Sequence, residues 1–107
     1  MISVTHFDVP ADDAEFVERA QVALAALAAR PGYLRGSVGR ATDDEQQWVI
    51  VTEWANVGSY RRALGAFEVK LNANPLLSLA RDEPSGYEQL VQIGPDGAVV
   101  RQASDHA

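Results

Sequence analysis

His6 is the residue in this chain best suited to proton transfer, because it is the only histidine outside the C-terminal tail. An imidazole takes up and releases protons near neutral pH, which is what a general base must do. In an extended segment His6 shares a face with Asp8, so a hydrogen bond between the two is the structural alternative. The sequence thus gives one candidate catalytic base and leaves a purely structural pairing open.

Trp54 and Tyr60 are aromatic residues at the joint between two different patterns. Residues 48–54 alternate with period two, as a strand does, and from Tyr60 onward apolar residues recur at helical spacing through Leu71. A tryptophan at such a joint stands where a pocket can open between a sheet and a helix, and the Tyr60 hydroxyl can point into it. Core packing is the alternative for both residues, since each also belongs to a regular apolar pattern.

Several kinds of chemistry have no support in the sequence. There are no cysteines, which excludes thiolate nucleophiles, disulfides and Cys-ligated metals. The two histidines lack the spacing of a metal site, and neither a Gly-x-Ser-x-Gly elbow nor a glycine-rich phosphate loop occurs. We therefore predict that the protein uses no metal and no cofactor.

Length and charge limit the partners. A chain of 107 residues with 47% apolar residues predicts one domain with a real core. The formal net charge of −6 argues against binding to nucleic acid or to anionic membranes, because both require a basic surface. The longest apolar stretch, around residues 22–29, is too short to cross a bilayer, and no targeting segment is visible. We expect a soluble, cytoplasmic protein.

Hydrophobic periodicity and turn residues place these candidates on regular elements. Pro31 and Gly32 end the first helix, because Pro31 cannot continue it and Gly32 tolerates a left-handed turn. Gly36 and Gly39 in the second strand indicate a bulge or the close approach of another group, and Asn56 or Ser59 can cap the second helix. The predicted elements are a strand at 2–9, a helix from 11 or 12 to about 29, strands at 33–42 and 48–54, a helix to about 71, a short helix from about 75 to 80, a strand at 87–93 and an edge strand at 98–101.

The main elements follow the order β-α-β-β-α-β, which predicts an α+β, ferredoxin-like fold. Its antiparallel sheet carries both helices on one face, so the other face needs cover. Residues 48–54 are apolar or aromatic on both sides of the strand, and two sheets packed face to face would bury them. We therefore predict a homodimer, built from a domain at residues 1–94 and followed by a C-terminal tail at 95–107.

Three stretches of the sequence together resemble one protein family. They are Pro31-Gly32-Tyr33, the run Trp48-Val-Ile-Val-Thr-Glu-Trp54, and Tyr60 with Ala63. This pattern, over residues 2–93, resembles the antibiotic biosynthesis monooxygenase (ABM) superfamily of dimeric α+β barrels. The resemblance implies a dimeric barrel in which each subunit holds a pocket between its sheet and its helices.

The haem-degrading branch of that family is disfavoured. Its members have an asparagine on the first strand, a tryptophan within the second helix and an iron-ligating histidine near the end of that helix. The corresponding positions here are Thr5, Ala63, and either Glu68 or Asn72. Without the histidine the chain has no obvious axial ligand for haem iron.

The resemblance therefore points to the cofactor-independent monooxygenases of the family. Their phenolic or quinol-like substrates supply the electrons for oxygen, and the protein binds the substrate, favours its anion and excludes water. The alternative is a non-catalytic ligand-binding or structural dimer module with the same fold. If the chain is an enzyme, we expect substrate contacts from Thr5, Phe7, Trp54, Tyr60 and Phe67, and His6 is a candidate catalytic residue for proton transfer.

Overall fold

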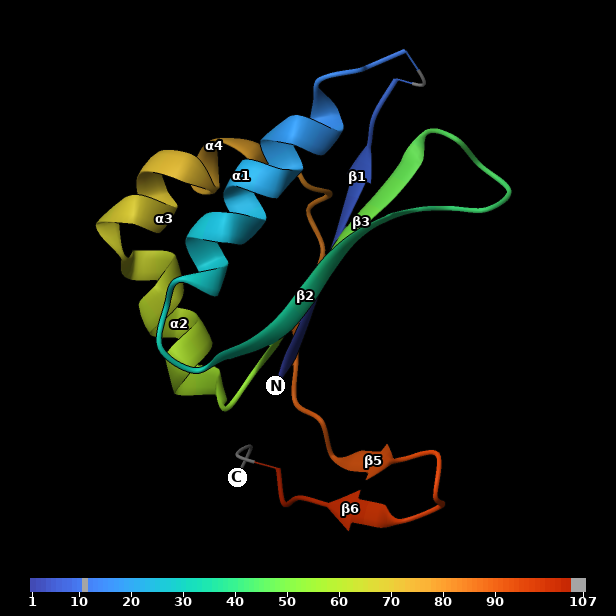
Figure 1. The fold of residues 1–107 in the computed structure, drawn as a ribbon, viewed down its shortest axis with the longest axis vertical. Coiled ribbons are helices and arrows are strands. Elements are labelled where there is room, and N and C mark those ends of the chain that lie inside the picture. The colour runs from blue at the N-terminus through green and yellow to red at the C-terminus, as the bar shows by residue number, and fades with distance from the viewer. Residues whose placement is uncertain (11, 105–107) are drawn as a thin grey trace.

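The structure is a computed structural model that describes residues 1–10 and 12–104 (Figure 1). Its elements, in chain order, are β1 (Ile2–Asp8), α1 (Phe16–Ala28), β2 (Tyr33–Arg40), β3 (Gln47–Trp54), α2 (Val57–Gly65), α3 (Phe67–Asn72), α4 (Asn74–Leu77), β4 (Gly86–Tyr87), β5 (Val91–Ile93) and β6 (Val99–Arg101).

The main sheet has the strand order β2-β3-β1-β4, and every neighbouring pair is antiparallel. The helices all lie on one side of this sheet, and its other face is left open (Figure 1). This arrangement confirms the predicted ferredoxin-like fold.

The alternation in β3 decides which side chains face the helices. Ile50, Thr52 and Trp54 are buried there, and each pairs across the sheet with a β1 or β2 residue on the same face. Val49 and Val51 point to the open face and stay partly exposed. The described residues therefore bury one face of this strand and leave the apolar residues of its other face partly exposed.

Helix α1 begins at Phe16, later than the sequence suggests. The Asp13 carboxylate accepts a hydrogen bond from the Glu15 backbone N–H at 3.1 Å, which holds the chain in a local turn. Such a side-chain contact competes with helix formation, so the expected start at residue 11 or 12 is wrong. Residue 11 itself lies outside the described residues.

The second long helix is in fact two helices. Helix α2 ends at Gly65, and the next residue, Ala66, is extended with ψ 142° before α3 begins. This break rotates α3, so Val69 is buried whereas Phe67 and Leu71 are 73% and 59% exposed. The single apolar stripe predicted from Tyr60 to residue 71 is therefore wrong beyond the break.

Two turn predictions are confirmed around the start of α2. The Asn56 carboxamide oxygen accepts hydrogen bonds from the Ser59 N–H at 2.8 Å and the Ser59 hydroxyl at 2.9 Å, and so caps the helix. Gly32, with φ +88°, lies so close that an added Cβ would collide with the Ser59 side chain. A glycine is required here for both conformation and space.

Gly36 is the point of close approach expected in β2. An added Cβ would lie 2.8 Å from Leu24 Cδ1 and 3.0 Å from the Val51 carbonyl oxygen. The register irregularity lies just before it, between Tyr33 and Arg35.

The predicted strand at 87–93 divides between two sheets. Only Gly86–Tyr87 pairs with β1, and β5 then leaves the body to pair with β6 in a separate hairpin. Figure 1 shows this hairpin projecting away from the main sheet. Its apolar side chains at Val91, Ile93 and Val99 are all more than half exposed.

Candidate functional site

Trp54 is a core residue in this structure. Its side chain is 1% exposed, and its indole N–H donates a hydrogen bond of 2.8 Å to the Thr52 hydroxyl. Thr52 is in turn hydrogen-bonded to Ser3, and the Tyr33 ring meets the indole edge-on with ring centroids 5.4 Å apart. The polar group of this tryptophan is thus already satisfied by the protein.

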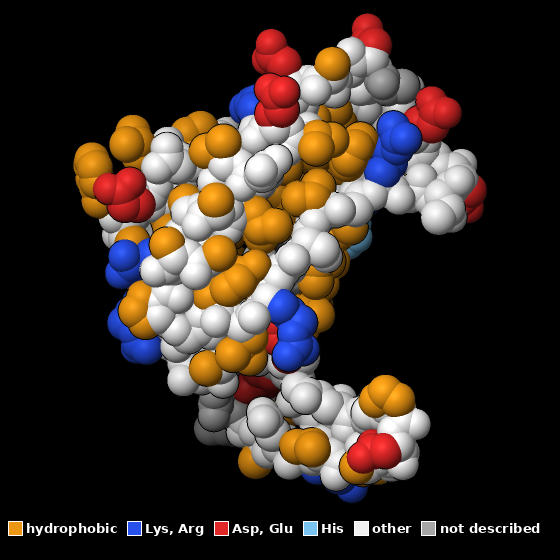
Figure 2. Space-filling model, in the orientation of Figure 1, with side chains coloured by type: hydrophobic (Ala, Val, Ile, Leu, Met, Phe, Trp, Pro, Cys, Tyr) orange, Lys and Arg blue, Asp and Glu red, His pale blue; other side chains and the backbone are white. Residues whose placement is uncertain are grey.

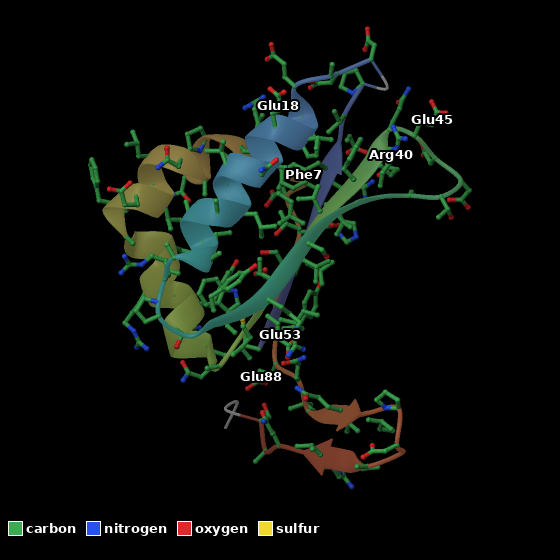
Figure 3. All side chains as sticks on the ribbon, in the orientation of Figure 1. Phe7, Glu18, Arg40, Glu45, Glu53 and Glu88 are labelled. Atoms are coloured by element: carbon green, nitrogen blue, oxygen red, sulfur yellow. The ribbon has the colours of Figure 1, made fainter. Side chains whose placement is uncertain are left out.

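Phe7 is also enclosed in the interior. It is 1% exposed and packs edge-on against Phe16, with ring centroids 5.4 Å apart. Figure 3 shows Phe7 in the layer between α1 and the sheet. The space between sheet and helices is filled at this point.

An open cleft of about 630 Å³, which we call the edge cleft, lies instead at the β1 edge. Its walls come from β1, α2, α4 and the edge segment, by which we mean residues 80–85. Its lining mixes apolar side chains, such as Leu64 and Leu77, with charged and polar groups. A mixed lining of this kind suits a small aromatic molecule that bears a hydroxyl group.

The cleft meets the edge of β1 rather than one of its faces. Val4, Thr5 and His6 all line it, although consecutive side chains of a strand point to opposite sides. The edge segment follows β1 here: the Val4 N–H donates to the Ser85 carbonyl at 2.7 Å, and the Arg81 N–H donates to the His6 carbonyl at 2.9 Å. Of the residues between these two hydrogen bonds, Asp82 and Glu83 line the cleft.

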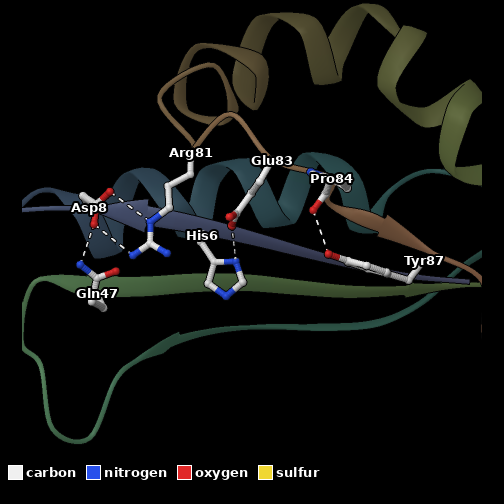
Figure 4. A network of polar contacts seen from close by, with 7 residues as sticks. All are labelled: His6, Asp8, Gln47, Arg81, Glu83, Pro84 and Tyr87. Carbon is white, nitrogen blue, oxygen red and sulfur yellow. Dashed lines mark hydrogen bonds and ion pairs between the residues drawn. The ribbon is translucent and has the colours of Figure 1, made fainter.

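His6 and Glu83 form a pair across this opening. The His6 Nδ1 lies 2.8 Å from a Glu83 carboxylate oxygen, and the two side chains are 43% and 39% exposed. Figure 4 shows the second ring nitrogen turned away from Glu83. An imidazole with one nitrogen held and the other open has the arrangement that a general base needs.

Asp8 belongs to a neighbouring cluster (Figure 4). Its carboxylate accepts one hydrogen bond of 2.6 Å from the Gln47 amide and two of 3.1 Å from the Arg81 guanidinium. The Gln47 hydrogen bond and, after it, Arg81 hold the pKa of Asp8 below its ordinary value. Asp8 thus ties the edge segment to β1, and the His6–Asp8 pairing considered above is replaced by His6–Glu83.

The predicted site residues divide into three groups. Thr5, His6 and Tyr60 all line the edge cleft, with His6 on the face of the sheet that also carries Val49. Phe7 and Trp54 are buried outside it, and the Trp54 ring lies behind Tyr60 at a centroid distance of 5.8 Å. Phe67 lies on the exposed surface of α3 and does not line the cleft.

Sequence reasoning missed the edge segment as part of a site. Arg81 and Glu83 lie in a polar stretch whose composition predicts a plain loop, and their partners are more than 70 residues earlier in the chain. A loop with several charged residues directly before a short strand is the one signal that could have suggested it.

A second hollow of about 990 Å³ adjoins the first and shares Tyr60, Leu64 and Ser85 with it. The shared residues place Tyr60 between the two spaces. A ligand larger than one ring therefore has room to extend along α2.

Among the described residues there is no cluster of three or more His, Cys, Asp or Glu side chains that could hold a metal ion. No helix in the same part of the chain is long and apolar enough to span a membrane.

Comparison with solved structures finds the same fold in several proteins. SnoaB from Streptomyces nogalater, a cofactor-independent oxygenase, is 26% identical with a TM-score of 0.66, covering 83% of this chain and 94% of SnoaB. A variant of SnoaB aligns at 28% identity and a TM-score of 0.65, over 74% of this chain and 81% of the variant. A conserved protein from Methanosarcina mazei shares the fold at 19% identity and a TM-score of 0.64, over 79% and 84% of the two chains.

Among curated protein sequences, none matches this chain. The sequence comparison with protein families is specific, however. Residues 1–70, which include β1 and the whole of β3 and α2, match the antibiotic biosynthesis monooxygenase family. Because this match spans more than half of the chain, the chain belongs to the antibiotic biosynthesis monooxygenase family.

Proposed function

We propose that this protein is a cofactor-independent monooxygenase that acts on a phenolic or quinol-like aromatic molecule bound in the edge cleft. The observation that carries the proposal is that Thr5, His6 and Tyr60 meet in one cleft in a member of this family. The 28% identity to a cofactor-independent oxygenase supports the same reaction class.

The substrate in this proposal supplies all the electrons. For an anthrone-type ring, loss of a proton gives an anion that passes one electron to dioxygen, and the resulting radical pair joins as a peroxide. Loss of water then leaves a carbonyl. One ring methylene group and one dioxygen thus give one ketone and one water, with four electrons passing from carbon to oxygen. The protein binds the ring, accepts the proton and returns it to the departing oxygen.

Each cleft residue has a part in this scheme. His6 accepts the proton that the substrate loses, and Thr5 and Tyr60 contact the ring and its oxygen atoms. Phe7 and Trp54 do not contact the substrate. Their packing in the core holds β1 and the Tyr60 ring in position. Phe67 has no part, because its side chain points to solvent on α3.

Oxygen uptake with a panel of hydroquinones and anthrones, without added cofactor, tests the proposal. We expect one dioxygen consumed per product formed and, with isotopically labelled dioxygen, one labelled oxygen atom in the product. His6→Gln should lower kcat by about a hundredfold, the usual contribution of a general base. Phe67→Ala is the matched control and should keep the wild-type rate.

A wild-type protein that turns over no member of the panel would contradict the enzymatic proposal. In that case the non-catalytic alternative is favoured, and equilibrium binding of the same panel, followed by quenching of tryptophan fluorescence, would test it. Saturable binding without oxygen uptake identifies a ligand-binding module.

We further propose that the functional unit is a homodimer formed through the open face of the sheet. Ile2, Val4, Val49 and Val51 point to that face and remain partly exposed. Figure 2 shows the molecule hollowed between this side of the body and the C-terminal hairpin, where a second copy could sit. Covering a sheet face with the same face of another subunit is a common arrangement.

Light scattering at micromolar concentration tests the dimer. The expected mass is twice that of the chain, and Val51→Glu should shift it to the monomer, because a charge in the centre of the interface would be buried without a partner. A wild-type monomer would contradict the proposal.

A further inference from the structure

We propose that Glu83 is the positioning residue for His6. It accepts the Nδ1–H of the neutral imidazole, and so leaves the lone pair on Nε2 as the proton acceptor. This inference rests on the proposed function for its catalytic meaning, although the tautomer it assigns can be measured without any substrate.

The distance between His6 and Glu83 indicates which ring nitrogen of His6 carries the proton. The 2.8 Å separation of His6 Nδ1 and the Glu83 carboxylate oxygen is that of a strong, charge-assisted hydrogen bond. A carboxylate can only accept, so the nitrogen that faces it must carry the proton. The hydrogen bond at one ring nitrogen therefore decides which nitrogen remains basic.

The backbone around Glu83 holds its side chain in place. On one side the Arg81 N–H donates to the His6 carbonyl at 2.9 Å, and on the other the Ser85 carbonyl accepts from Val4 at 2.7 Å. The Tyr87 hydroxyl also donates to the Pro84 carbonyl at 2.9 Å (Figure 4). A carboxylate presented by a segment fixed at both ends is preorganised, which is what a positioning residue requires.

The other charged groups near His6 do not replace Glu83. Asp8 is two residues away on the same strand, but its two oxygens accept from Gln47 and Arg81. Asp82 lines the cleft beside Glu83, and β3 presents the uncharged Val49 opposite His6. Among these groups Glu83 is the carboxylate that contacts the imidazole.

The open position of the pair suits proton transfer to a bound molecule. Both side chains are about two-fifths exposed, and both residues are among those that line the cleft. In the proposed reaction Nε2 accepts the proton of a substrate hydroxyl bound in the cleft, and the carboxylate stabilises the imidazolium that forms. Glu83 itself need not touch the substrate.

Nitrogen-15 NMR of histidine-labelled protein tests the tautomer directly. In the wild type we expect the neutral His6 ring to show Nδ1 protonated and Nε2 unprotonated, with the His6→Gln variant identifying its signals. Glu83→Ala should shift the ring toward the Nε2–H form, and Glu83→Gln should retain the wild-type form because the amide oxygen still accepts.

Kinetics on a substrate from the panel supply the second measurement. Glu83→Ala should lower kcat by about tenfold with KM unchanged, the loss expected for one hydrogen bond to a charged group. Glu83→Gln should recover part of that loss. Asp8→Ala is the matched control: it releases the edge segment from β1 at the other ion pair but leaves the His6 tautomer unchanged.

The possible failures are distinguishable. If the wild type turns over substrate and Glu83→Ala keeps both the Nδ1–H tautomer and the wild-type kcat, the positioning role is overturned and the monooxygenase proposal stands. Equal loss in Asp8→Ala and Glu83→Ala would also overturn it, in favour of a purely mechanical role of the edge segment. If the wild type itself is inactive, the proposed function fails, and the tautomer in the Glu83 variants still decides whether Glu83 sets the state of His6.

Discussion

The interior around Trp54 and the edge cleft around His6 both contain aromatic rings and polar groups, but the polar groups differ in whether they are enclosed or exposed. In the interior, the Trp54 indole N–H, the Thr52 hydroxyl and the Ser3 hydroxyl satisfy one another, and Trp54 and Thr52 are each 1% exposed. At the edge, His6 contacts Glu83 through Nδ1, and its side chain is 43% exposed to solvent. Aromatic character alone therefore does not mark a site; an accessible polar group does.

The two regions also differ in how they are held. The interior is fixed by dense packing among buried apolar side chains, which tolerates little change in volume. The edge cleft is fixed by a few ion pairs and backbone hydrogen bonds at the surface. Substitutions in the interior should thus reduce stability, and substitutions at the edge should change binding or catalysis and leave stability nearly intact.

Trp54→Ala should produce the largest effect. Removing a fully buried indole leaves a cavity and an unsatisfied pairing at Thr52, so the free energy of unfolding should fall by about 3–5 kcal/mol. Urea denaturation at a fixed protein concentration measures this. A variant with wild-type stability but no ligand binding would contradict the core role of Trp54 and would indicate that this residue contacts the ligand.

Gly36→Ala should be the next largest. Its new Cβ would press on Leu24 Cδ1 and on the Val51 carbonyl, which is backbone and cannot move aside, and the expected loss of stability is about 1–3 kcal/mol. Gly39→Ala is the matched control on the same strand, because the nearest atom to its added Cβ is a Val49 methyl at 3.5 Å. Equal losses in the two variants would contradict steric crowding as the cause.

Tyr60→Phe tests whether a substitution in the edge cleft changes ligand binding without changing stability. The ring keeps its contact with Trp54, so the free energy of unfolding should change by less than about 0.5 kcal/mol. The lost hydroxyl should weaken binding of a phenolic ligand by about three- to tenfold, the effect of one hydrogen bond. Fluorescence titration measures the affinity, and an unchanged affinity would remove this hydroxyl from the proposed contacts.

The smallest effect should come from the ion pair that ties the edge segment to β1. Gln47 and Arg81 lower the pKa of Asp8 in the folded state below the ordinary carboxyl value of 3.8. The stabilisation is therefore present above that pH and is lost as the pH falls through the folded-state value. Thermal melts between pH 5 and about pH 2 should show a smaller acid destabilisation in Asp8→Asn than in the wild type. Identical acid profiles would show that the pair contributes nothing measurable.

Much of the fold could be predicted because it depends on local pattern. The alternation in β3, the Asn56 cap and the turn at Gly32 each follow from the types of a few adjacent residues, and all three are confirmed. The start of α1 and the break after Gly65 do not follow from the pattern, since a single side-chain contact in one case and a local change in backbone conformation in the other override the periodicity.

For the candidate site, the sequence placed Thr5, His6 and Tyr60 on elements that meet in the fold, and these three do line one cleft. It could not separate Tyr60 from Phe67, because helical spacing implies a shared face only while the helix continues. It could not find Glu83, because the partner of His6 comes from a segment near the other end of the chain.

The sequence by itself determined the order of the elements, the family and the residue types available for chemistry, because short-range patterns and composition encode these directly. Only the tertiary structure decided which polar groups are already satisfied and which stay open. That distinction depends on contacts such as Trp54 to Thr52 or His6 to Glu83, and the second of these exists only after the edge segment has folded against β1. The Trp54 joint that the sequence singled out is a packed core, and the chemistry we propose lies at the strand edge beside it.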